Sequence, residues 1–346
     1  MRILITGGAG FIGCHTCARF AKKGAEVVAF DNLSRRGSSS NADWLNREHA
    51  VRIIQGDIRH SADLEACFLS EGPFDAVIHL AAQVAVTTSV TNPREDFDIN
   101  ALGTFNVLEA ARAQNPHPVM LYASTNKVYG GMEDIVVVED EDRYRYRDLP
   151  AGIPVSYRLD FHSPYGCSKG AADQYVRDYS RIYGIPTVVL RQSCIYGTRQ
   201  FGIEDQGWVA WFVIAAVFQH PIVIYGNGKQ VRDVLYVEDL VNAYEQAIDR
   251  RDQVAGRIFN IGGGPDYALS IWKEFGPLLE NLLGHKIPVS YSDWRPGDQP
   301  VYISDITETR TKLGWAPRIK PAEGIRNLYD WVLENKDLVA QELGFR

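Results

Sequence analysis

The first thirteen residues constrain the fold of this chain more than any other stretch. An apolar run from Ile3 to Ile5 is typical of a buried strand, and glycines follow it at positions 7, 10 and 13. Gly7 allows a sharp turn, Gly10 allows backbone N–H groups to approach a ligand, and Gly13 allows a helix to pack on the strand. A helix that begins at Phe11 points its unpaired N–H groups and positive dipole end at this turn. The pattern therefore predicts a site for the pyrophosphate of a dinucleotide.

A carboxylate follows at the end of the next strand. Residues 26–30 are apolar enough for a second buried strand, and Asp31 comes directly after them. A carboxylate at this position can accept hydrogen bonds from both hydroxyls of an adenosine ribose and would repel a 2′-phosphate, which favours NAD over NADP. Arg35 and Arg36 leave NADP open, because a guanidinium nearby could hold that phosphate. Chance glycines in an ordinary strand–helix–strand unit are the alternative.

Strands and helices alternate along the first 190 residues. After a polar loop to about residue 43, apolar runs and helical periodicity predict further strands at 51–55, 74–80, 119–123 and 187–190, with helices at 61–69, 94–114 and 162–183. This alternation predicts an α/β fold, a Rossmann-type doubly wound parallel sheet with helices on both faces.

The remainder of the chain loses this regularity. We expect residues 1–190 to form the Rossmann domain, with parts of 225–262 returning to it, and residues 191–346 to form mainly a smaller mixed α/β lobe with segments at 208–219, 222–225, 241–250, 258–261, 271–283 and 289–291. Residues 131–161 are predicted to be a long charged loop. Its acidic run is expected to face solvent, and its Tyr144–Arg147 stretch could cover a substrate.

Composition excludes several classes of function. The net charge of −7 and the lack of a basic block argue against nucleic-acid binding. No apolar run reaches the length of a membrane span, and the chain begins directly with a strand, so we expect a cytoplasmic protein. The five cysteines are scattered, and Cys14 and Cys17 fall in a helix packed on the sheet. We therefore expect no disulfide framework and no metal site.

Tyr165 and Lys169 are one helical turn apart, on the same face of the predicted helix. A phenol with a pKa near about 10 is a poor base at neutral pH. An adjacent ammonium and an oxidised nicotinamide would both favour the phenolate and draw its pKa toward the working range. Thr125, at the end of the preceding strand, is placed to hydrogen-bond the same substrate hydroxyl. These three residues together predict a hydroxyl-oxidising site.

The motifs at residues 6–13, 124–130 and 165–169 resemble those of the extended short-chain dehydrogenase/reductase family over essentially the whole chain. The resemblance implies NAD as cofactor, a nucleotide-linked sugar as substrate, and a homodimer or homotetramer formed through helices near 100–114 and 165–183. It implies that Thr125, Tyr165 and Lys169 are catalytic. Strand-end positions and the resemblance together predict that the cofactor contacts Gly7, Gly10, Phe11, Ile12, Asp31, Asn32, Asp57, Ile58, Leu80, Ala81, Ala82, Asn100, Tyr165 and Lys169. The predicted substrate-binding residues are Thr125, Asn126, Gln206, Arg232, Arg295 and Asp298.

The residues after Thr125 discriminate among the reactions of this family. Members that dehydrate a sugar nucleotide carry Asp-Glu there, whereas this chain has Asn126 and Lys127, which cannot supply an acid–base carboxylate pair. The segments at 124–130, 162–170 and 199–208 are most similar to members that epimerise the sugar at C2 through a 2-keto intermediate. A UDP-sugar 4-epimerase, a UDP-glucuronate decarboxylase and a non-catalytic NAD-sensing protein are the alternatives. The sugar and the base stay open.

Overall fold

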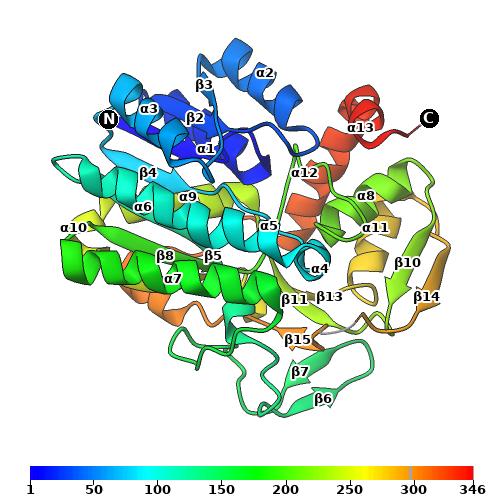
Figure 1. Cartoon of the computed structure of the whole chain (residues 1–346). Coiled ribbons are helices and arrows are strands. Elements are labelled where there is room, and N and C mark those ends of the chain that lie inside the picture. The colour runs from blue at the N-terminus through cyan, green and yellow to red at the C-terminus, as the bar shows by residue number, and fades with distance from the viewer. Residues whose placement is uncertain (296–297, 346) are drawn as a thin grey trace.

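A parallel sheet forms the centre of the computed structural model, which describes residues 1–295 and 298–345 (Figure 1). Within these residues the sheet has seven strands in the order β12-β8-β5-β4-β1-β2-β3. They are β1 (Arg2–Thr6), β2 (Glu26–Asp31), β3 (Arg52–Gln55), β4 (Ala76–His79), β5 (Val119–Thr125), β8 (Thr187–Gln192) and β12 (Arg257–Ile261). The register places Leu4 beside Val28 on one side and Val77 on the other. The predicted doubly wound parallel sheet is confirmed.

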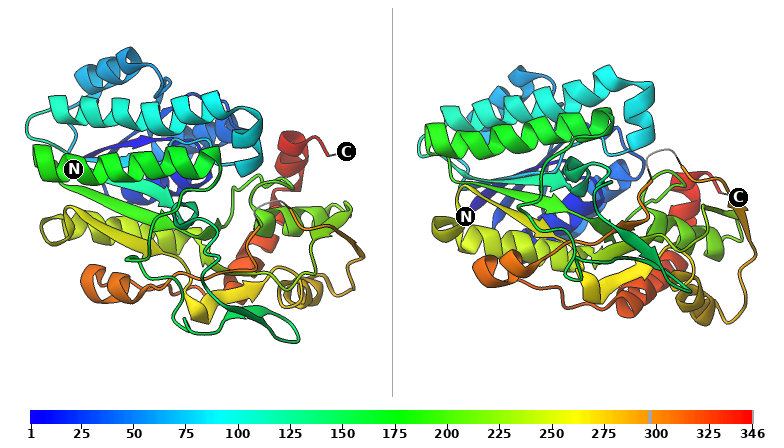
Figure 2. Two further views of the ribbon diagram at one scale, coloured as in Figure 1. Left: turned by 60° about the horizontal axis from the view of Figure 1, so that its bottom comes forward. Right: turned by 90° about the horizontal axis from the view of Figure 1, so that it is seen from below.

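Helices cover both faces of the sheet, because alternate strand residues point to opposite sides. Ile3 and Ile5 share one buried cluster with Cys14 and Cys17, while Leu4 belongs to the cluster on the other face. The first face is covered by α1 (Phe11–Lys22), α2 (Ser38–His49) and α9 (Val237–Asp249); the second by α3 (Ser61–Glu71), α6 (Gly103–Ala113) and α7 (Ser163–Tyr183). The turned views in Figure 2 show α6 and α7 on one side of the sheet and α9 on the other.

Two segments differ from the prediction. The expected loop up to about residue 43 contains the start of α2, which begins at Ser38 although three serines open it. Burial of Ala42 and Leu45 against the sheet outweighs the weak helix propensity of these serines. The expected single helix over 94–114 is divided into α5 (Pro93–Phe97), a π-helical turn at Asp98–Leu102 and α6, with α4 (Val86–Thr91) before them.

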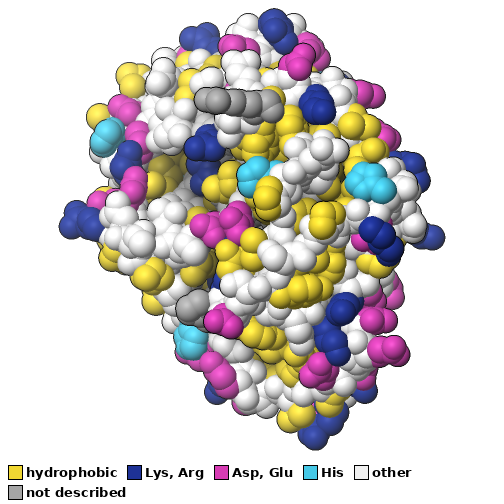
Figure 3. Space-filling view, turned by 90° about the vertical axis from the view of Figure 1, so that its right-hand side faces the viewer, with side chains coloured by type: hydrophobic (Ala, Val, Ile, Leu, Met, Phe, Trp, Pro, Cys, Tyr) yellow, Lys and Arg dark blue, Asp and Glu magenta, His cyan; other side chains and the backbone are white. Residues whose placement is uncertain are grey.

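The second lobe is a separate mixed layer with its own apolar core, as predicted. In it β11 (Val231–Tyr236) pairs with β9 (Cys194–Tyr196), β13 (Ala268–Ser270) and β15 (Val301–Tyr302), while β10 (Ile222–Tyr225) pairs with β14 (Val289–Ser292). The helices here are α8 (Trp208–Val217), α11 (Phe275–Leu283), α12 (Pro321–Glu334) and α13 (Lys336–Leu343). A short turn at Pro265–Tyr267 lies beside β11, whereas α10 (Arg251–Val254) and the turn Thr309–Leu313 pack on the first face of the parallel sheet. Figure 3 looks onto this side, where acidic, basic and apolar side chains are mixed over the surface.

The segment predicted as a charged loop contains a short hairpin, β6 (Val137–Glu139) and β7 (Tyr144–Tyr146). The hairpin packs on the second lobe: Arg143 forms an ion pair with Glu274 at 2.6 Å, and the Tyr146 hydroxyl donates to the carbonyl of Val301 at 2.9 Å. The Tyr144–Arg147 stretch is therefore held by the lobe itself. Among the described residues, no helix is long and apolar enough to cross a membrane.

Candidate active site

A pocket of about 400 Å³ lies where the carboxyl ends of the parallel strands meet. Most of the predicted cofactor residues line it: Gly7, Gly10, Phe11, Ile12, Asp31, Asn32, Asp57, Ile58, Leu80, Ala81, Ala82, Tyr165 and Lys169. Gln206, predicted to contact substrate, lines it as well. The segments after β1, β2, β3 and β4 and the last residues of β5 reach this pocket because their strands run in the same direction.

The glycine turn has the shape that a pyrophosphate site needs. Gly7 has a φ of +68°, and a Cβ on it would lie 2.7 Å from the backbone nitrogen of Ala81. A Cβ on Gly13 would collide with the Gly7 carbonyl. Gly10 caps α1 without any side-chain hydrogen bond, so the first N–H groups of the helix have no side-chain acceptor at this cap. These observations fit the pyrophosphate of NAD.

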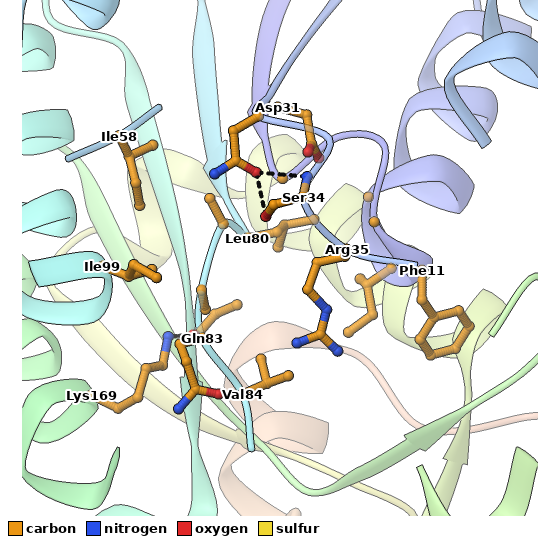
Figure 4. Close-up of a pocket in the computed structure, with 18 of the residues that line it drawn as sticks. Phe11, Asp31, Ser34, Arg35, Ile58, Leu80, Gln83, Val84, Ile99 and Lys169 are labelled. Atoms are coloured by element: carbon orange, nitrogen blue, oxygen red, sulfur yellow. Dashed lines mark hydrogen bonds between the residues drawn. The ribbon is translucent and has the colours of Figure 1, made fainter. Parts of the chain in front are cut away.

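Asp31 is buried at the end of β2, with 8% of its surface exposed. Its carboxylate accepts hydrogen bonds from the backbone N–H of Leu33 at 2.8 Å and of Ala9 at 3.0 Å. Burial raises the pKa of Asp31, and these backbone donors oppose that rise. Figure 4 shows Arg35 extending from the loop after β2 into the pocket, where its guanidinium donates to the side chain of Gln206.

Two of the predicted cofactor residues, Asn32 and Asp57, form a charged cluster with Arg59. Asp57 accepts hydrogen bonds from Asn32 at 2.9 Å and from the Nε of Arg59 at 3.0 Å. The Arg59 hydrogen bonds hold the pKa of Asp57 well below its usual range. Asp57 is therefore an ionised hydrogen-bond acceptor at the rim of the pocket.

Tyr165 and Lys169 are buried in the lining of the pocket, with 8% and 3% of their surfaces exposed. Thr125, with 7% exposed, is buried beside Tyr165 but does not line the pocket. Burial raises the pKa of Tyr165 to about 12, and a hydrogen bond with Thr125 opposes this. Burial lowers the pKa of Lys169 to about 7. The Lys169 ammonium donates to the Ala123 carbonyl at 2.6 Å and lies 4.3 Å from the centre of the Tyr122 ring. Within the chain itself, burial thus moves the pKa of Tyr165 away from the working range.

Asn100 lies in a buried polar network behind the pocket and does not line it. Its amide nitrogen donates to Asp96 at 3.1 Å and to the Gln83 carbonyl at 3.0 Å. The Asp96 carboxylate also accepts from Gln83 at 2.8 Å and from the Ser168 hydroxyl at 2.5 Å. Since Ser168 lies between Tyr165 and Lys169 on α7, the network fixes the helix that carries both side chains.

The predicted substrate residues of the second lobe form two groups. Arg232 pairs with Asp298 at 2.5 Å. Arg295 pairs with Asp205 at 3.1 Å and lies 4.0 Å over the Tyr225 ring. Residues 296–297, between the two predicted positions of this loop, lie outside the described residues. Asn126 contacts Thr125, whose hydroxyl donates to its side-chain oxygen at 3.3 Å. These residues lie beyond the lining of the strand-edge pocket.

Several residues that line the pocket have no role predicted from the sequence. Gln83 follows Ala81 and Ala82 directly in the loop after β4, so its position along the chain was a usable signal. Ser34 follows Asp31 closely in the same way. The position along the chain gives no such signal for Thr88 of α4 and Glu95 of α5, because these residues lie inside helices and not at the end of a strand. The unassigned lining residues also include Gly56, Val84, Thr88, Glu95, Ile99, Ala123, Ser124 and Gln192.

Comparison with known proteins agrees with this site. Residues 3–262 match the model of the NAD dependent epimerase/dehydratase family. The chain is 44% identical to a CDP-paratose 2-epimerase of Salmonella typhi, over 96% of this chain and 99% of that protein. The UDP-glucose 4-epimerase of Thermotoga maritima, solved with UDP-glucose, superposes with a TM-score of 0.84 at 30% identity, covering 97% of this chain and 100% of that one.

A second solved relative carries the cofactor itself. The UDP-glucose 4-epimerase of Thermus thermophilus, solved in complex with NAD, has a TM-score of 0.79 at 30% identity and covers 96% of this chain and 98% of that one. The family match spans most of the chain, and the glycine turn fits the cofactor of the family. The chain is therefore an NAD-dependent enzyme and belongs to the NAD dependent epimerase/dehydratase family.

Proposed function

We propose that this enzyme epimerises a nucleotide-linked sugar at C2, and that CDP-paratose, converted to CDP-tyvelose, or a close analogue is its substrate. The observation that carries the proposal is the 44% identity to a CDP-paratose 2-epimerase over nearly the whole chain. The hydroxyl-oxidising residues Thr125, Tyr165 and Lys169 support it. Asn126 and Lys127 favour epimerisation over dehydration, because neither can serve as a carboxylate acid or base.

In the proposed reaction Tyr165 takes the proton of the C2 hydroxyl and returns it later. Thr125 hydrogen-bonds the same hydroxyl, and a charged Lys169 favours the phenolate. Because burial raises the pKa of Tyr165 to about 12, this support is needed for proton removal near neutral pH. The glycine turn and Asp31 would hold NAD, which would supply reversible hydride transfer at C2 and a positive charge that favours the phenolate.

Arg232 and Arg295 are proposed to bind the diphosphate, since a guanidinium fork matches two phosphate oxygens. Gln206, Asn126 and Asp298 are proposed to complete the substrate contacts. Asn32, Asp57, Ile58 and Leu80 are proposed to complete the cofactor site, with Asp57 as the acceptor for the adenine amine. Asn100 is proposed to act from behind, through Gln83.

Substrate deuterated at C2 tests the position of chemistry. We expect the label to reappear at C2 of the product and not to exchange with water, because a hydride on reduced NAD does not exchange with solvent. Unlabelled substrate turned over in deuterated water should likewise gain no label at C2. Loss of the deuterium to water would instead indicate proton abstraction.

A UDP-sugar 4-epimerase is the second candidate, favoured by the similarity to the Thermotoga maritima enzyme. It predicts a kinetic isotope effect only with label at C4. Parallel assays with C2- and C4-labelled sugars linked to CDP and to UDP therefore show which carbon reacts and whether the enzyme uses the cytidine or the uridine nucleotide.

We further propose a cytoplasmic homo-oligomer assembled through α6 and α7, which lie side by side (Figure 1). These helices expose apolar side chains to solvent, including Phe105 at 39%, Tyr175 at 54% and Ile182 at 65%. Such a surface is typical of a subunit interface. Light scattering after size-exclusion chromatography should give a dimer or tetramer, and Ile182→Glu should shift it toward the monomer.

A further inference from the structure

Lys127 is a cation beside the proposed catalytic threonine that the proposed reaction does not yet use. It lies in the 3₁₀ turn Asn126–Tyr129 that follows β5. Its backbone N–H donates to the Thr125 hydroxyl oxygen at 3.2 Å, so its main chain is tied to that residue. Its side chain reaches across to the second lobe.

The Lys127 ammonium enters the cluster that contains Arg232. It donates to the side-chain oxygen of Gln299 at 3.3 Å. Gln299 is held in turn, because its amide donates to the Gly130 carbonyl and its backbone N–H donates to the Asp298 carboxylate at 3.0 Å. That carboxylate pairs with Arg232 at 2.5 Å. Arg232 therefore pairs directly with this carboxylate, and Lys127 is linked to it through Gln299.

The charges in this cluster favour an added anion. Burial and, after it, the neighbouring Arg232 lower the pKa of Lys127 to about 8, and Asp298 opposes both. An ammonium has three N–H donors, and within residues 1–295 and 298–345 Lys127 uses one of them, on a neutral amide. By contrast, the ammonium of the surface residue Lys286 pairs directly with a carboxylate, that of Glu280, at 2.7 Å. A phosphate would satisfy the remaining donors and offset the excess positive charge.

We propose that Lys127 binds the sugar-bearing phosphate of the substrate, as a second cation beside Arg232. The inference rests on the proposed function, because it requires a nucleotide-diphosphate sugar. Lys127 is only two residues from Thr125 in the chain, so it would hold the phosphate that links nucleotide and sugar near that residue. This contact would help to set which carbon of the sugar faces Tyr165.

Calorimetric titration of the NAD-loaded enzyme with CDP, UDP and their monophosphates tests this role. For the diphosphate that the wild type binds, Lys127→Met should weaken affinity about 10-fold or more, the range for a lost charge-assisted hydrogen bond. Affinity for the matching monophosphate should change less than about 3-fold, because it lacks the second phosphate. Lys286→Met is the matched control and should bind as the wild type does.

Lys127→Gln separates charge from structure. Its amide can still donate to Gln299, so a purely structural role of Lys127 predicts wild-type affinity for the diphosphate. The proposal instead predicts that Lys127→Gln loses affinity as Lys127→Met does. Lys127→Arg, which keeps the positive charge, should retain most of the binding. The role of Lys127 would be overturned if Lys127→Gln bound the diphosphate with wild-type affinity. It would also be overturned if Lys127→Met lost as much affinity for the monophosphate as for the diphosphate. A wild-type enzyme that binds neither diphosphate would overturn the proposed function as well.

Discussion

At the scale of single residues, Asp31 places a negative charge where a dinucleotide ribose would bind. It is buried and held by two backbone donors, so its orientation is fixed before any ligand arrives. Asp31→Asn keeps the shape and removes the charge. We expect NAD affinity to fall about 10-fold or more, because charge-assisted hydrogen bonds are lost. Fluorescence titration with NAD and NADP measures both affinities.

The same variant should bind NADP relatively better, since the repulsion of a 2′-phosphate disappears and Arg35 points into the pocket. Adding Arg35→Ala to Asp31→Asn should remove this gain. Equal affinity of the wild type for NAD and NADP would contradict the role given to Asp31.

Tyr165 is the residue on which the proposed proton transfer depends. Tyr165→Phe keeps the ring but removes the exchangeable proton, and we expect kcat to fall by about 10²–10⁴ while NAD stays bound. Steady-state kinetics and the absorbance of bound cofactor check the two parts. Tyr175→Phe, exposed on the same helix, should keep wild-type activity. A Tyr165→Phe enzyme with unchanged kcat would exclude the phenol as the base.

At the scale of elements, the Asp96 network connects α5, the turn after it and the loop after β4 to α7. The Ser168 hydroxyl donates to the buried Asp96 carboxylate at 2.5 Å. Ser168→Ala leaves that oxygen without its donor, which should cost about 1–3 kcal/mol in the free energy of unfolding. Urea unfolding measures this cost, and the expected change is a lower midpoint at unchanged slope.

Cys167→Ala is the matched control for this helix, because Cys167 is the exposed neighbour of Ser168. Its free energy of unfolding should stay within about 0.5 kcal/mol of the wild type. If Ser168→Ala were equally harmless, the network would not stabilise α7.

At the scale of the whole molecule, a buried neutral histidine makes stability depend on pH. His79 lies between the hydroxyls of Thr6 at 2.6 Å and Thr104 at 2.9 Å, and burial, followed by Lys169, lowers its pKa to about 3. The unfolded value is about 6.5. Between these values the unfolded chain binds more protons, so the stabilisation is complete above the unfolded pKa and is lost as pH falls toward the folded one.

As the pH falls through that window, we expect protonation of His79 to lower the free energy of unfolding by up to about 1.4 kcal/mol for each pH unit. His15, whose pKa burial lowers to about 4, acts in the same direction. Urea unfolding between about pH 5 and 7.5 should show a shallower pH dependence for His79→Gln than for the exposed control His285→Gln. The same slope for both variants would show that His79 is not the coupled proton site.

The features that depend on local geometry could be predicted from the sequence. The glycine spacing, the carboxylate at the end of β2 and the one-turn separation of Tyr165 and Lys169 predict the pocket edge, because each involves residues close in the chain. Strand direction then places Thr125 at that edge. Gly7 has the positive φ that its turn requires.

The contacts between distant segments could not be predicted in this way, because they depend on how the whole chain packs. α2 begins at Ser38 because Leu45 packs on the apolar face of the sheet. Asn100 lies behind the pocket because it forms hydrogen bonds with Asp96 and Gln83 there. Lys127 and Asp298 are far apart in the chain, so no spacing rule could predict their common cluster. Such contacts form only when packing of the two lobes offsets the entropy of closing the chain between them.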